Sequence, residues 1–147
     1  MRQLTPPFCL TNGLHFFVMF WRLGKSVRPP PHVRASLKAF FGDAVDHVRV
    51  VEHSLFARLH IRAVATTRKR AIFLSGSADD FFTDPILMLH EYCHVLNQWE
   101  PGELTTLRYL AECMRRGYWD NRFEIEAREF ATDNVYRFRA MLTKHAV

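Results

Sequence analysis

The chain has 147 residues, of which 48% are hydrophobic and 24% are charged. A chain of this length can bury about two-thirds of its unfolded surface in one core, and its composition excludes an intrinsically disordered or fibrous protein. The net charge of +5 arises from 20 Lys and Arg against 15 Asp and Glu, and the basic residues are scattered, so we expect no specific nucleic-acid binding.

The three cysteines, Cys9, Cys93 and Cys113, form no CxxC pair. An odd count without paired spacing argues against a disulfide framework and favours a reducing compartment. We therefore expect a cytoplasmic protein, with export by a specialised secretion system as the alternative. Cys93 lies inside the motif described below, but on a helix it points away from the second histidine of that motif, so we interpret it as a buried structural thiol.

Residues 1–30 read as an apolar leader followed by a proline-rich linker. The apolar run FCLTNGLHFFVMFW (residues 8–21) is interrupted by Asn12 and His15 and is too short to span a bilayer. No small residues follow at positions suited to signal-peptidase cleavage. We expect the run to be a strand or short helix packed on the domain, or an extension whose role the sequence does not reveal. The stretch RPPPH (residues 28–32) would be a stiff extended spacer.

A single domain is expected over residues 31–147. It opens with a helix at residues 33–42, where apolar side chains recur at helical spacing before Gly42. Three strand-like runs follow: HVRVV (47–51), HIRAVAT (60–66) and AIFLS (71–75). The last two flank the basic turn TTRKR (66–70) as a hairpin would. We interpret this as a solvated turn, with a phosphate-binding patch as the alternative.

The second half of the chain is expected to be helical. In the segment 83–102, Asp84 is the expected N-cap, Pro85 the first helical residue and Pro101-Gly102 the end. A helix at residues 103–117 carries one apolar stripe: Leu104, Leu107, Leu110 and Met114. A long helix over residues 122–144 ends the chain. A small antiparallel or mixed sheet followed by a helical half predicts an α+β fold.

The segment MLHEYCHVLNQW (residues 88–99) holds an HExxH motif. On a helix, residues four apart share a face, so His90 and His94 can bind one metal ion. Glu91 is rotated by about 100° from His90, which places it beside the metal, where a general base for a metal-bound water is needed. A catalytic zinc has three protein ligands and one open position. No further His follows at close spacing, so the third ligand must come from later in the chain.

The candidates for the third ligand are Glu124 and Glu126 on the last helix. Glu124 shares its helical stripe with apolar residues only: Ala127, Ala131, Val135, Phe138 and Leu142. Glu126 lies on a mostly polar stripe. A carboxylate on a core-facing stripe is costly unless a positive group compensates it, and a Zn²⁺ ion held by the HExxH helix would do so. We therefore expect Glu124 to be the third ligand.

Two other interpretations of Glu124 need no metal. With Asn121 as the N-cap, Glu124 would stand at the N3 position and would close a capping box. Alternatively, Glu124 would pair with Arg128, four residues later on the helix surface.

The pattern HEYCH followed by EIEA (residues 124–127) resembles the zincin metallopeptidases of the glutamate-ligand type (gluzincins), whose third ligand is the first Glu of an ExxA or ExxS element. More narrowly, VRASLKAFFGDAVDHVRVV, IRAVATTRKRAIFL and DPILMLHEYCHVLNQ resemble the metallopeptidase domain of bacterial extracellular contractile injection system loci, over roughly residues 30–99. This resemblance implies a zincin-like fold and zinc as the cofactor. It also implies that His90, His94 and Glu124 are the ligands and that Glu91 is the catalytic base.

The chain departs from that family at three places. RKR stands at the hairpin tip where the family favours glycine, and LNQ stands where a pair of glutamines is usual. Arg128 replaces the Asp that orients a histidine in many relatives, so the residue that usually supports this histidine is missing.

These features predict a zinc-dependent peptidase that acts on a protein or peptide substrate. Glu91 would take a proton from the zinc-bound water and pass it to the leaving amine. A second electrophile is also expected, and the sequence leaves four candidates unranked: Tyr118, Tyr136, Arg137 and His145. An extended substrate would add to the edge of the sheet, which we expect at AIFLS.

The alternative from another class is a zinc-stabilised, non-catalytic binding module with a basic surface. The oligomeric state is not predicted by any feature of the sequence.

Overall fold

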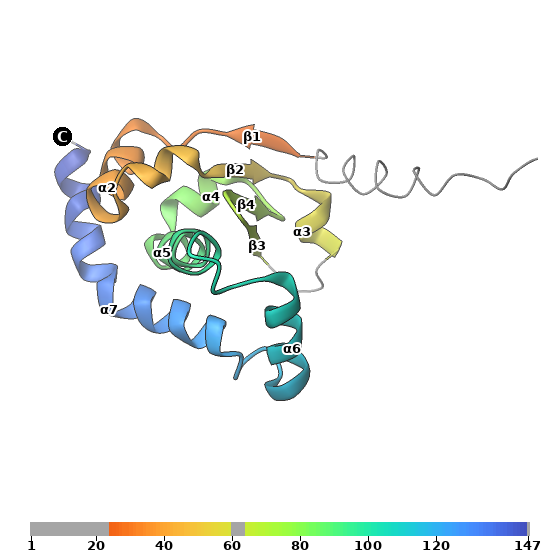
Figure 1. Cartoon of the computed structure of the whole chain (residues 1–147). Coiled ribbons are helices and arrows are strands. Elements are labelled where there is room, and N and C mark those ends of the chain that lie inside the picture. The colour runs from red at the N-terminus through yellow and green to blue at the C-terminus, as the bar shows by residue number, and fades with distance from the viewer. Residues whose placement is uncertain (1–23, 60–63, 147) are drawn as a thin grey trace, which may run out of the picture.

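The computed structural model describes residues 24–59 and 64–146 (Figure 1). The apolar run at 8–21 and the first part of the expected strand 60–66 lie outside the described residues. The elements are, in chain order, β1 (Lys25–Val27), α2 (Pro31–Phe41), the 3-10 helix η1 (Asp43–His47), β2 (Arg49–Glu52), α3 (Leu55–Leu59), β3 (Ala65–Arg68), β4 (Ala71–Leu74), α4 (Ala78–Thr83), α5 (Pro85–Cys93), the π-helix η2 (His94–Trp99), α6 (Thr106–Arg116) and α7 (Arg122–His145). None of the helices in these ranges is long and apolar enough to cross a membrane.

The strands form one mixed sheet in the order β1-β2-β4-β3. The pairs β1–β2 and β3–β4 are antiparallel, and β2 runs parallel to β4. The hairpin expected around the basic turn is confirmed, because Ala65 pairs with Leu74 and Arg68 pairs with Ala71. Arg70 in that turn has a φ of 61°, a conformation that glycine adopts without steric cost. The small mixed sheet and the helical half confirm an α+β fold.

The expected position of AIFLS at the sheet edge is wrong. Its residues Ala71–Leu74 form β4, which lies between β2 and β3 and has all of its side chains buried. A run with four consecutive buried side chains suits an inner strand covered on both faces. The edge strand next to β4 is β3, whose side chains are all half-buried.

Several expected boundaries differ from the structure. The extended spacer RPPPH stops at Pro30, and α2 begins at Pro31, since a proline at the first helical position lacks only an N–H that the helix would leave unpaired. The expected strand HVRVV begins later than predicted, because His47 still belongs to η1. Residues 25–27, which the sequence places in the leader, pair with β2 as strand β1.

Helix α5 lies between the sheet and α7 (Figure 1). It begins as predicted, because the side chain of Asp84 accepts hydrogen bonds from the backbone N–H groups of Ile86 and Leu87. Past Cys93 the helical path continues as η2. Ala127 and Ala131 on α7 are fully buried, and their small side chains let α7 approach α5 closely.

Helix α6 stands at the side of the molecule (Figure 1). It begins at Thr106. The preceding residue, Thr105, caps the helix, because its side chain accepts a hydrogen bond from the backbone N–H of Arg108. Of the predicted apolar stripe, only Leu104, which precedes the helix, is buried. Leu107 is 81% exposed, Leu110 52% and Met114 87%.

Candidate metal centre

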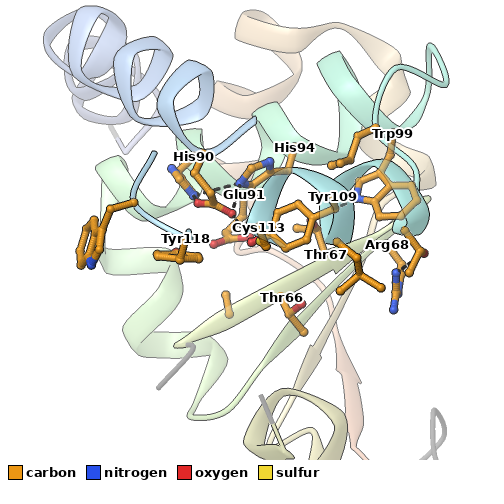
Figure 2. Close-up of a pocket in the computed structure, with 16 residues that line it drawn as sticks. Thr66, Thr67, Arg68, His90, Glu91, His94, Trp99, Tyr109, Cys113 and Tyr118 are labelled. Carbon is orange, nitrogen blue, oxygen red and sulfur yellow. Dashed lines mark hydrogen bonds and ion pairs between the residues drawn. The ribbon is translucent and has the colours of Figure 1, made fainter. Parts of the chain in front are cut away.

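Two histidines from consecutive turns of one helical path, His90 and His94, lie next to each other (Figure 2), and Glu124 from α7 faces both of them. The Nε2 atoms of His90 and His94 are 3.1 Å apart. Nε2 of His90 lies 3.3 Å from Oε2 of Glu124, and Nε2 of His94 lies 3.6 Å from Oε1 of Glu124. One potential ligand atom from each of the three residues lies within 4.8 Å of the others. The three residues expected to be ligands are thus brought together, and their role as ligands stays a prediction.

Glu124 faces α5 because α7 is rotated about its own axis so that the stripe carrying Glu124 points into the core. Glu124, Ala127 and Ala131 are buried on one stripe, whereas Glu126 is exposed. The first turn of α7 is fixed by Asn121, whose Oδ1 accepts from the backbone N–H of Phe123 at 3.0 Å. The exposure pattern of α7 therefore matches the apolar stripe in the sequence.

The two metal-free interpretations of Glu124 do not match its contacts. Asn121 does cap α7, but the carboxylate of Glu124 faces the two histidines and the hydroxyl of Tyr109, so it does not close a capping box. Arg128 donates instead to the backbone carbonyl of Trp119, and its guanidinium lies over the Trp119 ring.

Gln98 orients the second histidine. Its Oε1 lies 2.7 Å from Nδ1 of His94. An amide oxygen only accepts hydrogen bonds, so Nδ1 of His94 carries the hydrogen and Nε2 keeps its lone pair. The Nε2 of Gln98 donates to the Phe123 carbonyl at 3.0 Å and to Oε2 of Glu126 at 3.1 Å. Gln98 thus fills the supporting role that Arg128 leaves open. The sequence analysis missed it, although its spacing of four residues from His94 was a usable signal.

The three facing side chains fit a cation. Oε2 of Glu124 is buried without a hydrogen-bond partner among the described residues, and a buried carboxylate oxygen is costly unless a positive group compensates it. The two Nε2 atoms are 3.1 Å apart, and Nε2 of His90 is 3.3 Å from Oε2 of Glu124; both separations are close to the distance of about 3.3 Å between ligand atoms of a tetrahedral zinc with bonds of about 2.0 Å. Two imidazole nitrogens and one carboxylate oxygen are also a donor set that zinc accepts.

The charges at the site also favour a cation. Burial acts to raise the pKa of Glu124, but the facing rings of His90 and His94 and the hydrogen bond from Tyr109 hold that pKa well below its usual range. For His94, burial acts to lower the pKa, and the carboxylates of Glu124 and Glu91 more than offset it, so the pKa is raised. The site therefore presents a charged carboxylate to two imidazoles.

Glu91 is buried beside the cluster and is not one of the converging groups. Burial raises the pKa of Glu91, although the nearby histidines oppose this effect. Its side chain lines the same cavity as His90 and His94 (Figure 2). This is the position, beside the metal ligands, that the HExxH spacing predicts.

A tyrosine that the sequence analysis did not name holds Glu124. The hydroxyl of Tyr109 donates to Oε1 of Glu124 at 2.8 Å. Burial, and then the charge of Glu124, raise the pKa of Tyr109, so the hydroxyl keeps its proton. This contact depends on where α6 lies relative to α7. The spacing of residues within one helix does not predict that arrangement.

Of the four electrophile candidates, only Tyr118 lines the cavity. Burial and the nearby Glu124 carboxylate raise the pKa of Tyr118 to about 12. The other three have different surroundings: Tyr136 is exposed, Arg137 lies over the Phe40 ring, and Nδ1 of His145 is 3.0 Å from the Ser36 hydroxyl.

The site opens into a cavity of about 660 Å³. The edge strand β3 lines one side, and α6 with the turn after it lines another. Arg68 donates to Oγ1 of Thr106 at 2.5 Å, and Arg70 to Oε1 of Glu100 at 2.8 Å. The basic hairpin tip is therefore anchored to the chain that follows the motif, so it is more than a solvated turn.

The interpretation of Cys93 as a buried thiol is confirmed. Burial raises the pKa of Cys93 to about 11, and its Sγ accepts from the Asn97 amide at 3.7 Å. A neutral thiol of this kind is a poor metal ligand, because thiols ligate as thiolates.

A family model described as the eCIS core domain matches residues 29–102. The matched range covers α2, the sheet from β2 onward, and both histidines of the candidate centre. No curated protein and no solved structure matches the chain. The third facing residue, Glu124, lies outside the matched range.

Proposed function

The chain belongs to the eCIS core domain family, and from its candidate centre we propose that it is a zinc-dependent peptidase of the glutamate-ligand zincin type. In this proposal His90, His94 and Glu124 hold the zinc ion, and Glu91 is the general base. The zincin-like fold is part of the same proposal.

The observation that carries the proposal is the convergence of two histidines and a buried glutamate beside a second buried carboxylate, all on the wall of one cavity. A purely structural zinc site is usually closed by four protein ligands. Three converging ligands with a cavity next to them leave an open position, as a catalytic site requires.

Zinc bound there would lower the pKa of a coordinated water towards neutrality and polarise the substrate carbonyl. Glu91 would accept the proton of that water and deliver it to the leaving amine. Burial, which raises the pKa of Glu91, helps the carboxyl to hold the proton between the two transfers. The hydroxyl of Tyr118, with a pKa of about 12, stays protonated and is suited to donate to the developing oxyanion.

The substrate class follows from the strand beside the cavity. β3 is an edge strand, so an extended peptide can add to it by main-chain hydrogen bonds. We therefore place the substrate backbone along β3, between that strand and α6.

The second candidate function is a zinc-stabilised binding module without turnover. The sequence suggests a basic surface for it, but Arg68 and Arg70 are tied to Thr106 and Glu100. The observation that favours a binding function is instead the exposed apolar side of α6. Against it stands Glu91, because a binding module gains nothing from the cost of burying a carboxylate beside the metal ligands.

The test is metal analysis of the purified chain together with cleavage of a reduced and alkylated protein by the wild type and by Glu91→Gln. The proposal expects one zinc per chain in both proteins and cleavage by the wild type alone. A chain that binds no zinc, or one that binds zinc but cleaves no unfolded protein, would refute it.

A further inference from the structure

Helix α6 has an apolar side that the described part of the chain leaves uncovered. All residues of α6 are described, and none of them is buried. Leu107, Leu110 and Met114 stand at helical spacing along that side, and Trp119 extends it beyond the end of the helix, 73% exposed. We call these four residues the α6 apolar stripe. Apolar surface concentrated in this way marks a binding surface more often than scattered exposed residues do.

The charged residues of α6 have partners within the protein. Glu112 pairs with Arg115 at 3.3 Å and with Arg116 at 3.5 Å. Arg108 donates to the backbone carbonyl of Glu103 at 2.9 Å. A ligand that approaches the α6 apolar stripe therefore meets hydrocarbon rather than unpaired charge.

The stripe is continuous with the cavity of the candidate metal centre. Leu110 and Trp119 belong to the stripe and also line the cavity. The Trp119 ring packs edge-on against Tyr118, with ring centroids 5.5 Å apart, and the Arg128 guanidinium lies 5.5 Å from its centroid. These contacts hold Trp119 against Tyr118, which Figure 2 labels and which also lines the cavity.

Another part of the cavity wall offers backbone hydrogen-bonding groups to a ligand. It is formed by β3, a strand edge that an extended main chain can pair with. In an extended peptide, alternate side chains point to opposite faces. A peptide paired with β3 would therefore direct every second side chain to the same side.

We propose that the α6 apolar stripe binds large apolar side chains of an extended polypeptide that lies along β3. This inference rests on the proposed peptidase function, and it names the substrate class as unfolded segments in which large apolar residues recur at alternate positions. Such segments are buried in folded proteins, so the enzyme would select unfolded polypeptides over folded ones.

The test measures binding to the full-length Glu91→Gln protein, so that cleavage does not interfere. The probe is a fluorescein-labelled peptide of about ten residues, which spans about 33 Å when extended, with Leu and Thr alternating. The comparison peptide has Ser in place of each Leu. Fluorescence anisotropy is recorded for three proteins that all carry Glu91→Gln. The first has no other change, the second also carries Leu107→Ser and Met114→Ser, and the third also carries Tyr136→Ser. Tyr136 is the matched control, since it is 79% exposed on α7.

We expect the Leu peptide to bind at least about tenfold more tightly than the Ser peptide. The Leu107→Ser/Met114→Ser change should remove this difference without changing the zinc content, and Tyr136→Ser should preserve it. Equal binding of the two peptides, or unchanged binding by the α6 double variant, would overturn the inference.

Two other occupants of the stripe give different results. A second copy of the chain would make the wild type dimeric and the α6 double variant monomeric in sedimentation. If the chain's own apolar run at 8–21 occupied the stripe, the double change Phe16→Ser/Phe17→Ser would weaken that competitor and strengthen peptide binding. Either result overturns the inference.

The same experiments test the peptidase proposal independently of the proposed role of α6. If the peptide preference is present but the protein with Glu91 intact cleaves neither peptide, the stripe is a binding surface and the peptidase proposal is refuted. If the protein cleaves both peptides equally well, the peptidase proposal stands and the role of α6 is refuted.

Discussion

Gln98 connects the two helices that carry the candidate ligands, because its Oε1 bonds Nδ1 of His94 at 2.7 Å while its Nε2 donates to the backbone carbonyl of Phe123 at the start of α7. Phe123 directly precedes Glu124 in the chain. The same amide therefore sets the tautomer of one expected ligand and the position of the segment that bears another. This side chain therefore links the candidate metal site to the packing of α7 on the motif helix.

Gln98→Ala should lower zinc affinity by about 10- to 100-fold, since an outer partner fixes the ring orientation and tautomer of a ligand histidine. Gln98→Glu keeps an acceptor for Nδ1 of His94 and should restore part of the affinity. The matched control is Asn97→Ala in the same turn, whose side chain donates a hydrogen bond to the Cys93 sulfur rather than to His94. Competition against a fluorescent zinc chelator measures all three. Equal affinity for Gln98→Ala and Asn97→Ala would show that Gln98 does not position His94.

Glu124→Ala should abolish tight zinc binding, whereas Glu126→Ala should have little effect. Glu124 is buried against both histidines, while Glu126 is exposed and accepts from Gln98, which keeps a second acceptor at the Phe123 carbonyl. Zinc content after dialysis, measured by atomic emission, separates the two cases. Loss of zinc from both variants to the same extent would mean that Glu124 is not a specific ligand.

Zinc at about a hundred times its dissociation constant should stabilise the wild-type fold by about 2.7 kcal/mol, which raises the Tm by roughly 5–10 °C for a domain of this size. The reason is that the three converging groups come from α5, η2 and α7 and meet only in the folded state. Thermal unfolding followed by circular dichroism, with zinc or with EDTA, gives the difference. Glu124→Ala should show no such rise, and a rise of the same size in that variant would place the bound zinc elsewhere.

Much of the centre could be predicted from local sequence because its parts lie on two continuous helical segments, α5 with η2 and α7. The Asp84-Pro85 start sets the path of α5, and four-residue spacing then places His90 and His94 on one side. Ala127 and Ala131 mark the side of α7 that faces the core, so the same stripe predicted that Glu124 would be buried.

The features that the sequence analysis missed depend on contacts between distant segments. The place of β4 inside the sheet follows from its parallel pairing with β2, a non-local contact that the apolar run AIFLS does not specify by itself. Tyr109 reaches Glu124 only because α6 folds back towards the start of α7. The spacing along α6 predicted an apolar stripe, but it could not predict that the described chain would leave this stripe exposed.

Tyr118→Phe should lower kcat for a peptide substrate by about 100-fold or more, the usual cost of removing a donor to the oxyanion, with little change in KM or zinc content. Tyr109→Phe is the contrasting variant, because its hydroxyl donates to Glu124 and its loss should weaken zinc binding first. Steady-state kinetics with excess zinc, together with zinc titration, distinguishes the two tyrosines. A normal kcat in Tyr118→Phe would remove Tyr118 from the proposed mechanism.

Glu91→Gln should keep the zinc and the fold yet lose at least about 100-fold of the cleavage rate, the scale of general-base catalysis. Glutamine has nearly the same shape as glutamate but cannot accept a proton, so the substitution removes the base step alone. Cleavage of a reduced and alkylated protein is followed by gel, with circular dichroism and zinc content as controls on the same samples. The wild-type activity should also disappear with a chelator and return with added Zn²⁺. If the variant and the wild type were equally active, Glu91 would not be the base, and chelator-resistant activity would identify a contaminating protease. If both bound zinc and neither cleaved any of a broad set of peptides, the protein would be a zinc-stabilised binding module.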